Sequence, residues 1–145
     1  MSPMISKYFW LIMIVVMLIN IPFFKLRVRD EIKKYPFREY QYDKLIVGLT
    51  FYVILSCCVM GIAAIFGNID FMSEMDRPSW NFFTILLQAT TILEATSFFI
   101  WIWFFNGAKF LAKYGKVFNL PRWPVLMKII AAGLVVWSIF PIFVR

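Results

Sequence analysis

Histidine is absent from all 145 residues of the chain, and this absence excludes several kinds of chemistry. Histidine-ligated haem, the usual catalytic zinc sites and Ser–His–Asp catalysis each require a residue that the chain lacks. Cysteine is also scarce, because the only two, Cys57 and Cys58, are neighbours inside an apolar run. Adjacent side chains diverge, so we interpret them as small apolar core residues and not as a disulfide. The sequence therefore predicts no metal site, no cofactor and no enzymatic activity.

Charged residues are also scarce in this sequence. Only 16% of the residues are charged, whereas 62% are apolar. A soluble domain is usually closer to half apolar, so the composition predicts a chain whose solvent is lipid. The net charge is +7, and the basic residues lie between the long apolar runs. Contact with anionic lipids explains this placement better than nucleic-acid binding, which the sequence does not predict.

Four apolar runs are long enough to cross a bilayer, which needs about 20 residues for about 30 Å of hydrocarbon. They cover residues 8–24, 45–66, 80–105 and 125–144. Lipid offers the backbone no hydrogen-bond partner, and the runs do not alternate between apolar and polar residues, so helices are expected and a barrel is not. The prediction is an all-α integral membrane protein, with one four-span domain over residues 1–145, arranged as a small bundle with short loops.

The orientation follows from lysine and arginine, because short basic loops stay on the cytoplasmic side. Twelve of the 15 basic residues follow the first or the third run, and three lie on the other side. We therefore predict a multi-pass protein of the cytoplasmic membrane with both termini outside and two cytoplasmic basic loops. The residues expected to contact the membrane surface are Lys25, Arg27, Arg29, Lys33, Lys34, Lys109, Lys113 and Lys116.

Each basic loop has further features. In the second loop Asn106-Gly107 should break the third helix, and lysines then recur at helical spacing, which predicts a short amphipathic helix on the inner leaflet. In the first loop Pro36 should end any helix that precedes it. Its aromatic residues are interpreted as a lipid-facing collar, with docking of a cytoplasmic partner as the alternative; they are Tyr35, Phe37, Tyr40 and Tyr42. On the opposite side, Asp76 or Ser79 is the expected N-cap of the third helix.

Glu94 is the only ionisable side chain deep inside a run. Placing an acidic group at a helix centre opposes insertion by about 2.5–3.5 kcal/mol, and each Leu, Ile or Phe returns about 0.3–0.6 kcal/mol. We expect it to face the bundle interior or another protein. A helix places polar neighbours within two turns of it, namely Gln88, Thr90, Thr91 and Ser97. The hydroxyls and thiols available elsewhere in the chain are those of Tyr52, Ser56, Cys57 and Ser138.

Two functions from different classes fit these features. The first is a non-catalytic subunit that anchors or braces a larger membrane protein complex, in which Glu94 serves as an assembly contact. The second is a small homo-oligomeric transporter or channel, in which Glu94 binds a proton or a cation and the polar residues line the path. Its partners would be other membrane subunits or copies of itself, together with lipids, including anionic lipids of the inner leaflet. Small residues such as Gly48, Gly61, Gly67 and Gly133 are expected where helices meet, either within this chain or against another subunit.

Overall fold

The chain folds into helices throughout the part that the computed structural model describes, residues 3–69 and 80–144. The long helices are α2 (Phe9–Lys34), α3 (Glu39–Phe66), α5 (Phe82–Phe104) and α7 (Pro124–Val144). The short ones are α1 (Pro3–Lys7), η1 (Pro36–Arg38), α6 (Gly107–Tyr114) and η2 (Gly115–Phe118). All four long helices have the length and composition to cross a membrane, which confirms the predicted all-helical structure with four candidate spans.

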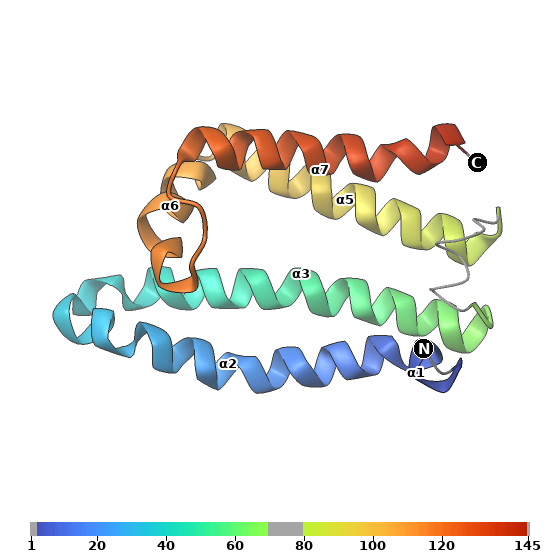
Figure 1. The fold of residues 1–145 in the computed structure, drawn as a ribbon, viewed down its shortest axis with the longest axis horizontal. Coiled ribbons are helices and arrows are strands. Elements are labelled where there is room, and N and C mark those ends of the chain that lie inside the picture. The colour runs from blue at the N-terminus through green and yellow to red at the C-terminus, as the bar shows by residue number, and fades with distance from the viewer. Residues whose placement is uncertain (1–2, 70–79, 145) are drawn as a thin grey trace.

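The helices α2 and α3 extend beyond the apolar runs that predicted them. Helix α2 continues to Lys34, and α3 already begins at Glu39. At 1.5 Å per residue, the 26 residues of α2 rise about 39 Å, which exceeds the hydrocarbon thickness. The turn between them therefore projects past α5 and α7 at one end of the molecule (Figure 1). Helix α2 ends just before Pro36, as predicted, because proline disfavours helical geometry in the residue before it.

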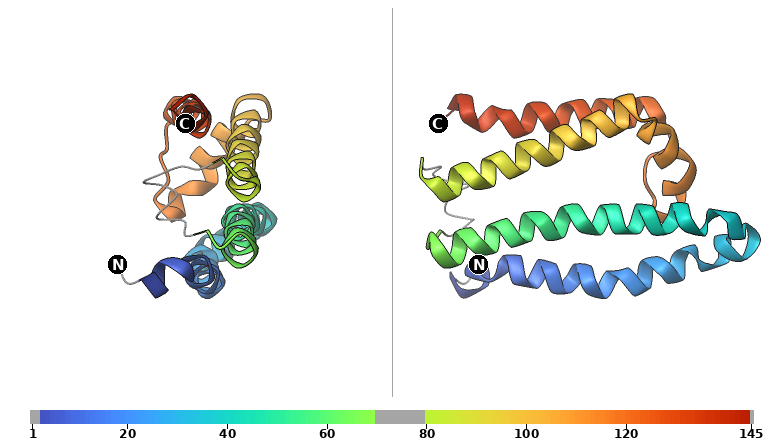
Figure 2. Two further views of the ribbon diagram at one scale, coloured as in Figure 1. Left: turned by 90° about the vertical axis from the view of Figure 1, so that its right-hand side faces the viewer. Right: turned by 180° about the vertical axis from the view of Figure 1, so that it is seen from behind.

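The long helices pack as an open arc in the order α2, α3, α5, α7 (Figure 2). Each packs on its neighbour along the chain, whereas α2 and α7 form the two edges of the arc and are not packed together. Both basic segments lie at one end, here called the basic end, and both termini lie at the other, the terminal end (Figure 1). At the basic end α6 contacts α3, α5 and α7, and η2 contacts α2, so this pair of short helices connects the two edges.

The best-packed part of the molecule is this basic end. Tyr42 and Tyr114 meet edge to face with their ring centroids 5.5 Å apart, and Phe24 meets Phe118 in the same way at 5.4 Å. Tyr42 is 2% exposed, so its predicted place in a lipid-facing collar is wrong, although Tyr35, Phe37 and Tyr40 are exposed. The buried residues of this cluster are Val28, Tyr42, Leu45, Ile46, Ile102, Ala108, Leu111, Tyr114, Met127 and Ala131.

The chain turns from α5 into α6 at Asn106, whose φ of 58° is left-handed and ends the preceding helix. Only glycine fits at the next position, because a Cβ on Gly107 would lie 2.7 Å from the Trp101 ring. The predicted amphipathic helix follows: Leu111 and Tyr114 are buried in the bundle, and its lysines are exposed. Its apolar face is thus covered by protein, and its position on the inner leaflet stays a prediction.

Helix α5 begins later than its expected caps would place it, because its N-cap is Asn81, two residues after Ser79 and five after Asp76. Asn81 forms a capping box with Thr84: the Thr84 amide donates to Asn81 Oδ1 and the Asn81 amide to Thr84 Oγ1, each over 3.0 Å. The prediction that Asp76 or Ser79 caps this helix is therefore wrong, and both residues lie outside the described ranges. The reciprocal bonds satisfy amides that the first turn of a helix leaves without partners.

Two of the glycines are close-packing positions and two are not. A Cβ on Gly61 would lie 2.8 Å from Cε3 of Trp10, and one on Gly67 would lie 2.6 Å from the Phe83 ring. Nothing lies within 4 Å of a Cβ built on Gly48 or Gly133. The predicted helix contacts are thus confirmed for Gly61 and Gly67 and wrong for the other pair within this chain.

Replacing Gly61 by alanine should destabilise the contact between α2 and α3. The added methyl group forces the Trp10 indole to move, and such overpacking lowers stability by about 1–3 kcal/mol. The free energy of unfolding in mixed micelles, followed by circular dichroism, measures the change. Gly133→Ala is the matched control, since it fills open space and should leave stability unchanged or raise it by up to about 1 kcal/mol. Equal stability of the two variants would contradict this packing.

Candidate functional site

Glu94 joins helices α5 and α3 through Ser56. The Ser56 hydroxyl donates to Glu94 Oε2 over 2.6 Å, a length typical of a hydroxyl donating to a carboxylate. Ser56 is one of the hydroxyls that the sequence offered as a partner from within the chain. Because α3 and α5 are neighbours in the arc, this bond fixes the rotation of each helix against the other near the middle of both.

The second carboxylate oxygen of Glu94, Oε1, differs from Oε2 in its hydrogen bonding. Glu94 Oε1 is buried and has no hydrogen-bond partner within residues 3–69 and 80–144, although the side chain as a whole is only partly buried. Buried polar atoms nearly always have a partner. One acceptor position of Glu94 is therefore left over once the described helices have packed.

Glu94 lies on the same face of α5 as Leu87, a residue of the pocket described below. Ser56, Met60 and Ala63 are four and three residues apart on α3 and share one face, as do Leu87 and Glu94, seven apart on α5. Met60, Ala63 and Leu87 line one pocket together with Trp10 of α2. This shared pocket, together with the Ser56–Glu94 bond, turns that face of α5 toward α3 and the start of α2.

Gln88 connects α5 to its other neighbour, α7. Its side-chain amide donates to the backbone carbonyl of Ser138. Ser138 is 1% exposed, and its own hydroxyl donates to the carbonyl of Val135 over 2.8 Å. Helix α5 is therefore held by a polar bond on each side, through Glu94 toward α3 and through Gln88 toward α7.

The remaining residues of the predicted polar stripe do not converge on Glu94. The hydroxyls of Thr90, Thr91 and Ser97 each donate to the carbonyl four residues earlier in α5, over 2.9, 3.0 and 2.7 Å. Serine and threonine often satisfy themselves in this way inside a helix. Of the five predicted residues, only Glu94 and Gln88 reach another helix through the described bonds.

The predicted membrane-surface residues are all exposed and gather at the basic end. The last turns of α2 carry Lys25, Arg27, Arg29, Lys33 and Lys34. Helices α6 and η2, at the same end of the molecule (Figure 1), carry Lys109, Lys113 and Lys116. Two aromatic contacts hold further cations near this end. The guanidinium of Arg38 lies 4.3 Å from the Tyr35 ring centroid, and Lys128 Nζ lies 5.0 Å from that of Trp103.

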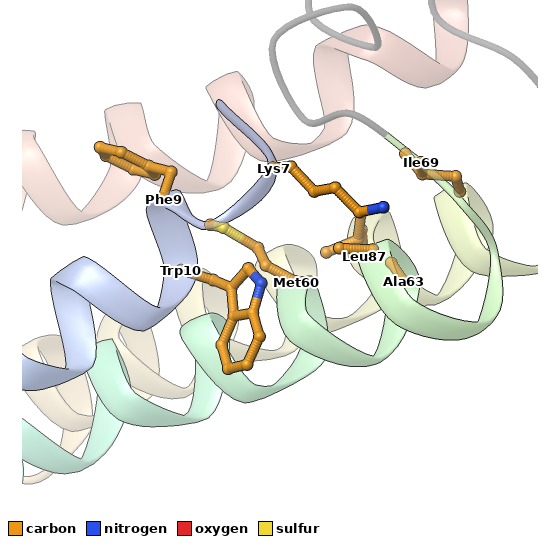
Figure 3. A pocket seen from close by; sticks show the side chains of 8 residues that line it. Lys7, Phe9, Trp10, Met60, Ala63, Ile69 and Leu87 are labelled. Atoms are coloured by element: carbon orange, nitrogen blue, oxygen red, sulfur yellow. The ribbon is translucent and has the colours of Figure 1, made fainter. Parts of the chain in front are cut away.

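Sequence reasoning missed a pocket at the terminal end (Figure 3). It lies where the start of α2, the last turns of α3 and the N-terminal half of α5 meet. Its one charged residue is Lys7. It is lined by Lys7, Phe9, Trp10, Met60, Ala63, Ala64, Ile69 and Leu87. The only signal in the sequence was a lysine followed by three aromatic residues, which is equally typical of an interfacial anchor.

Known proteins offer no guide to this arrangement. No protein-family model matches the chain, and neither the curated proteins nor the solved structures contain a match. Within the described residues, no group of three histidine, cysteine, aspartate or glutamate side chains is placed to hold a metal ion. The inference about function therefore depends on the geometry of this chain.

The Ser56–Glu94 bond should be measurable by a double-mutant cycle. Ser56→Ala and Glu94→Gln each weaken it, and their coupling energy should be about 0.5–2 kcal/mol, within the range found between membrane helices. Unfolding free energies of the two single variants and the double variant in mixed micelles give the coupling. Ser97→Ala paired with Glu94→Gln is the control, because the Ser97 hydroxyl bonds its own helix and should show no coupling. Additive effects of Ser56→Ala and Glu94→Gln would contradict the bond.

Proposed function

We propose that this chain is a non-catalytic integral membrane subunit that anchors or braces a larger membrane protein complex. The observation that carries the proposal is an open arc of helices in which Glu94 Oε1 has no partner among the described residues. A helix from another subunit, placed between α2 and α7, would complete a closed bundle. A donor on that helix would satisfy Glu94 Oε1 in the interior, where an unpaired polar group is unfavourable by about 1–3 kcal/mol.

The polar side chains of α5 support this function over chemistry or transport. Gln88 is engaged with the Ser138 carbonyl, and the hydroxyls of Thr90, Thr91 and Ser97 are engaged with their own helix. Groups used in this way stabilise the bundle and are poorly placed to bind a substrate. A transport path would instead need free hydroxyls and carbonyls along its length.

The edges of the arc provide the contact surface. Leu18 on α2 and Val136 on α7 are more than half exposed, and Gly133 on α7 leaves open space where a neighbouring helix can approach closely. Exposed apolar side chains alone would pack against lipid chains as well as against a partner protein. The carboxylate between the two edges is the feature that lipid chains cannot satisfy.

The basic end supports the proposed orientation and lipid contacts. Ten exposed lysines and arginines lie there, the eight predicted ones with Lys44 and Arg122, together with exposed Tyr35, Phe37 and Tyr40. Such a combination suits the headgroup region of a cytoplasmic leaflet with anionic lipids. In the assembled complex this end would hold the subunit at a fixed depth while the open side of the arc faces the partner.

A photo-crosslinking amino acid at Leu18 or Val136 should capture a different membrane protein in native membranes. Both positions lie on edge helices and are exposed, so a partner helix in the arc would be within reach. Mass spectrometry of the crosslinked bands, and of the complex purified in mild detergent, identifies the captured chain. Ile102 is the control position, because it is fully buried and should react only within its own chain.

The same experiment distinguishes the second function. Crosslinks only to copies of this chain would contradict the subunit proposal and favour a homo-oligomer that uses Glu94 for a proton or a cation. Proton- or cation-driven flux in liposomes should then be lost in Glu94→Gln. Within a foreign complex, Glu94→Ala should reduce the amount of co-purified partner, whereas Ser97→Ala should not.

A further inference from the structure

The pocket at the terminal end is formed by a break in the first helix. Helix α1 ends at Lys7, Tyr8 leaves helical geometry with φ −105° and ψ 12°, and α2 starts at Phe9. The break turns the Lys7 side chain over the end of α3, toward Leu87 and Ile69 (Figure 3). Trp10 is held against α3 by its contact with Gly61, so one wall of the pocket is fixed by helix packing.

The lining of this pocket is apolar apart from one ammonium group. Its walls are the side chains of Phe9, Trp10, Met60 and Leu87, and Ala63 and Ala64 leave room between them. Lys7 is exposed, and it is the only charged residue in the described part of the terminal end. In a bilayer that α2 crosses from its first turn, Lys7 would lie at headgroup depth and the pocket walls at the depth of lipid chains.

We propose that this pocket binds a membrane lipid with an anionic headgroup, whose acid group pairs with Lys7 and whose chain lies against Trp10, Met60 and Leu87. An anionic phosphate accepts a charge-assisted hydrogen bond from the ammonium. An alkyl segment suits walls made of aliphatic and aromatic side chains. A polar ligand would place its polar atoms against these walls, where they would have no hydrogen-bond partner. The site does not depend on the proposed subunit function.

Lys7 has a second possible role, which the test must separate from the first. A helix C-terminus favours a nearby cation, because its last carbonyls lack partners. At the end of α3 the Ala63 carbonyl accepts from the amides of Gly67 and Ile69, over 3.0 and 3.3 Å. If Lys7 only complements this helix end, removing its charge would lower stability in every lipid and leave lipid preference unchanged.

The experiment compares phosphatidylglycerol with phosphatidylcholine, each with brominated chains that quench nearby tryptophan, in nanodiscs that hold the full chain. Subtracting the emission of Trp10→Phe isolates the signal of Trp10. Quenching by phosphatidylglycerol should exceed quenching by phosphatidylcholine, and Lys7→Gln should reduce this preference about fivefold, as expected for one surface lysine. Lys7→Arg should retain it, and Lys33→Gln, at the basic end, should not affect it.

Three results would overturn the lipid site. The first is an unchanged preference in Lys7→Gln, and the second is an equal loss of thermal stability of that variant in both lipids, which would assign Lys7 to the end of α3. The third concerns the source of the anion. If inorganic phosphate alone stabilises the protein as much as phosphatidylglycerol does, in a manner that depends on Lys7, the ligand is a free anion and the apolar walls have no part in binding.

Discussion

The packing of α6 and η2 across the basic end is the interaction on which the arrangement of the long helices depends. These two short helices together contact α2, α3, α5 and α7, whereas α2 and α7 are not packed together. The helix break at Asn106 directs α6 into this position, and the absence of a side chain at Gly107 lets α6 pack against Trp101. The buried cluster gathers around α6, with Leu111 and Tyr114 at its centre. Along the rest of their length the helices associate mainly in neighbouring pairs.

Away from this cluster, apolar burial cannot drive association, because lipid chains solvate leucine as well as a helix does. Close contacts and polar bonds supply the remaining specificity. Gly61 lets α2 approach α3 through Trp10, Ser56 bonds Glu94 between α3 and α5, and Gln88 bonds the Ser138 carbonyl between α5 and α7. Each neighbouring pair of the arc thus has its own specific contact. The edges have none with each other, which is why the open side is the natural place for a partner.

Hydropathy predicted the number of helices and their approximate ranges, because a chain in lipid must satisfy its own backbone. It could not predict how far α2 and α3 continue beyond the apolar runs, since charged residues form helices outside lipid as readily as apolar ones form them inside. Glu94 was identifiable because charge is rare in a span, and Ser56 was among its expected partners. The bonds of Thr90, Thr91 and Ser97 within α5 and the burial of Tyr42 depend on rotamers and helix rotation. Periodicity along one helix does not contain that information.

The position of α6 in the chain has a consequence for biosynthesis. Tyr42 and Leu45 belong to α3, but the side chains of Leu111 and Tyr114 that cover them are translated more than 60 residues later. Helices α2 and α3 are therefore synthesised well before the element that joins them to α5 and α7. During that interval the uncovered face of α3 is available to lipid or to an insertion factor. Folding of the basic end consequently has to await the synthesis of α6, and truncation before Gly107 would leave α2, α3 and α5 without their common core.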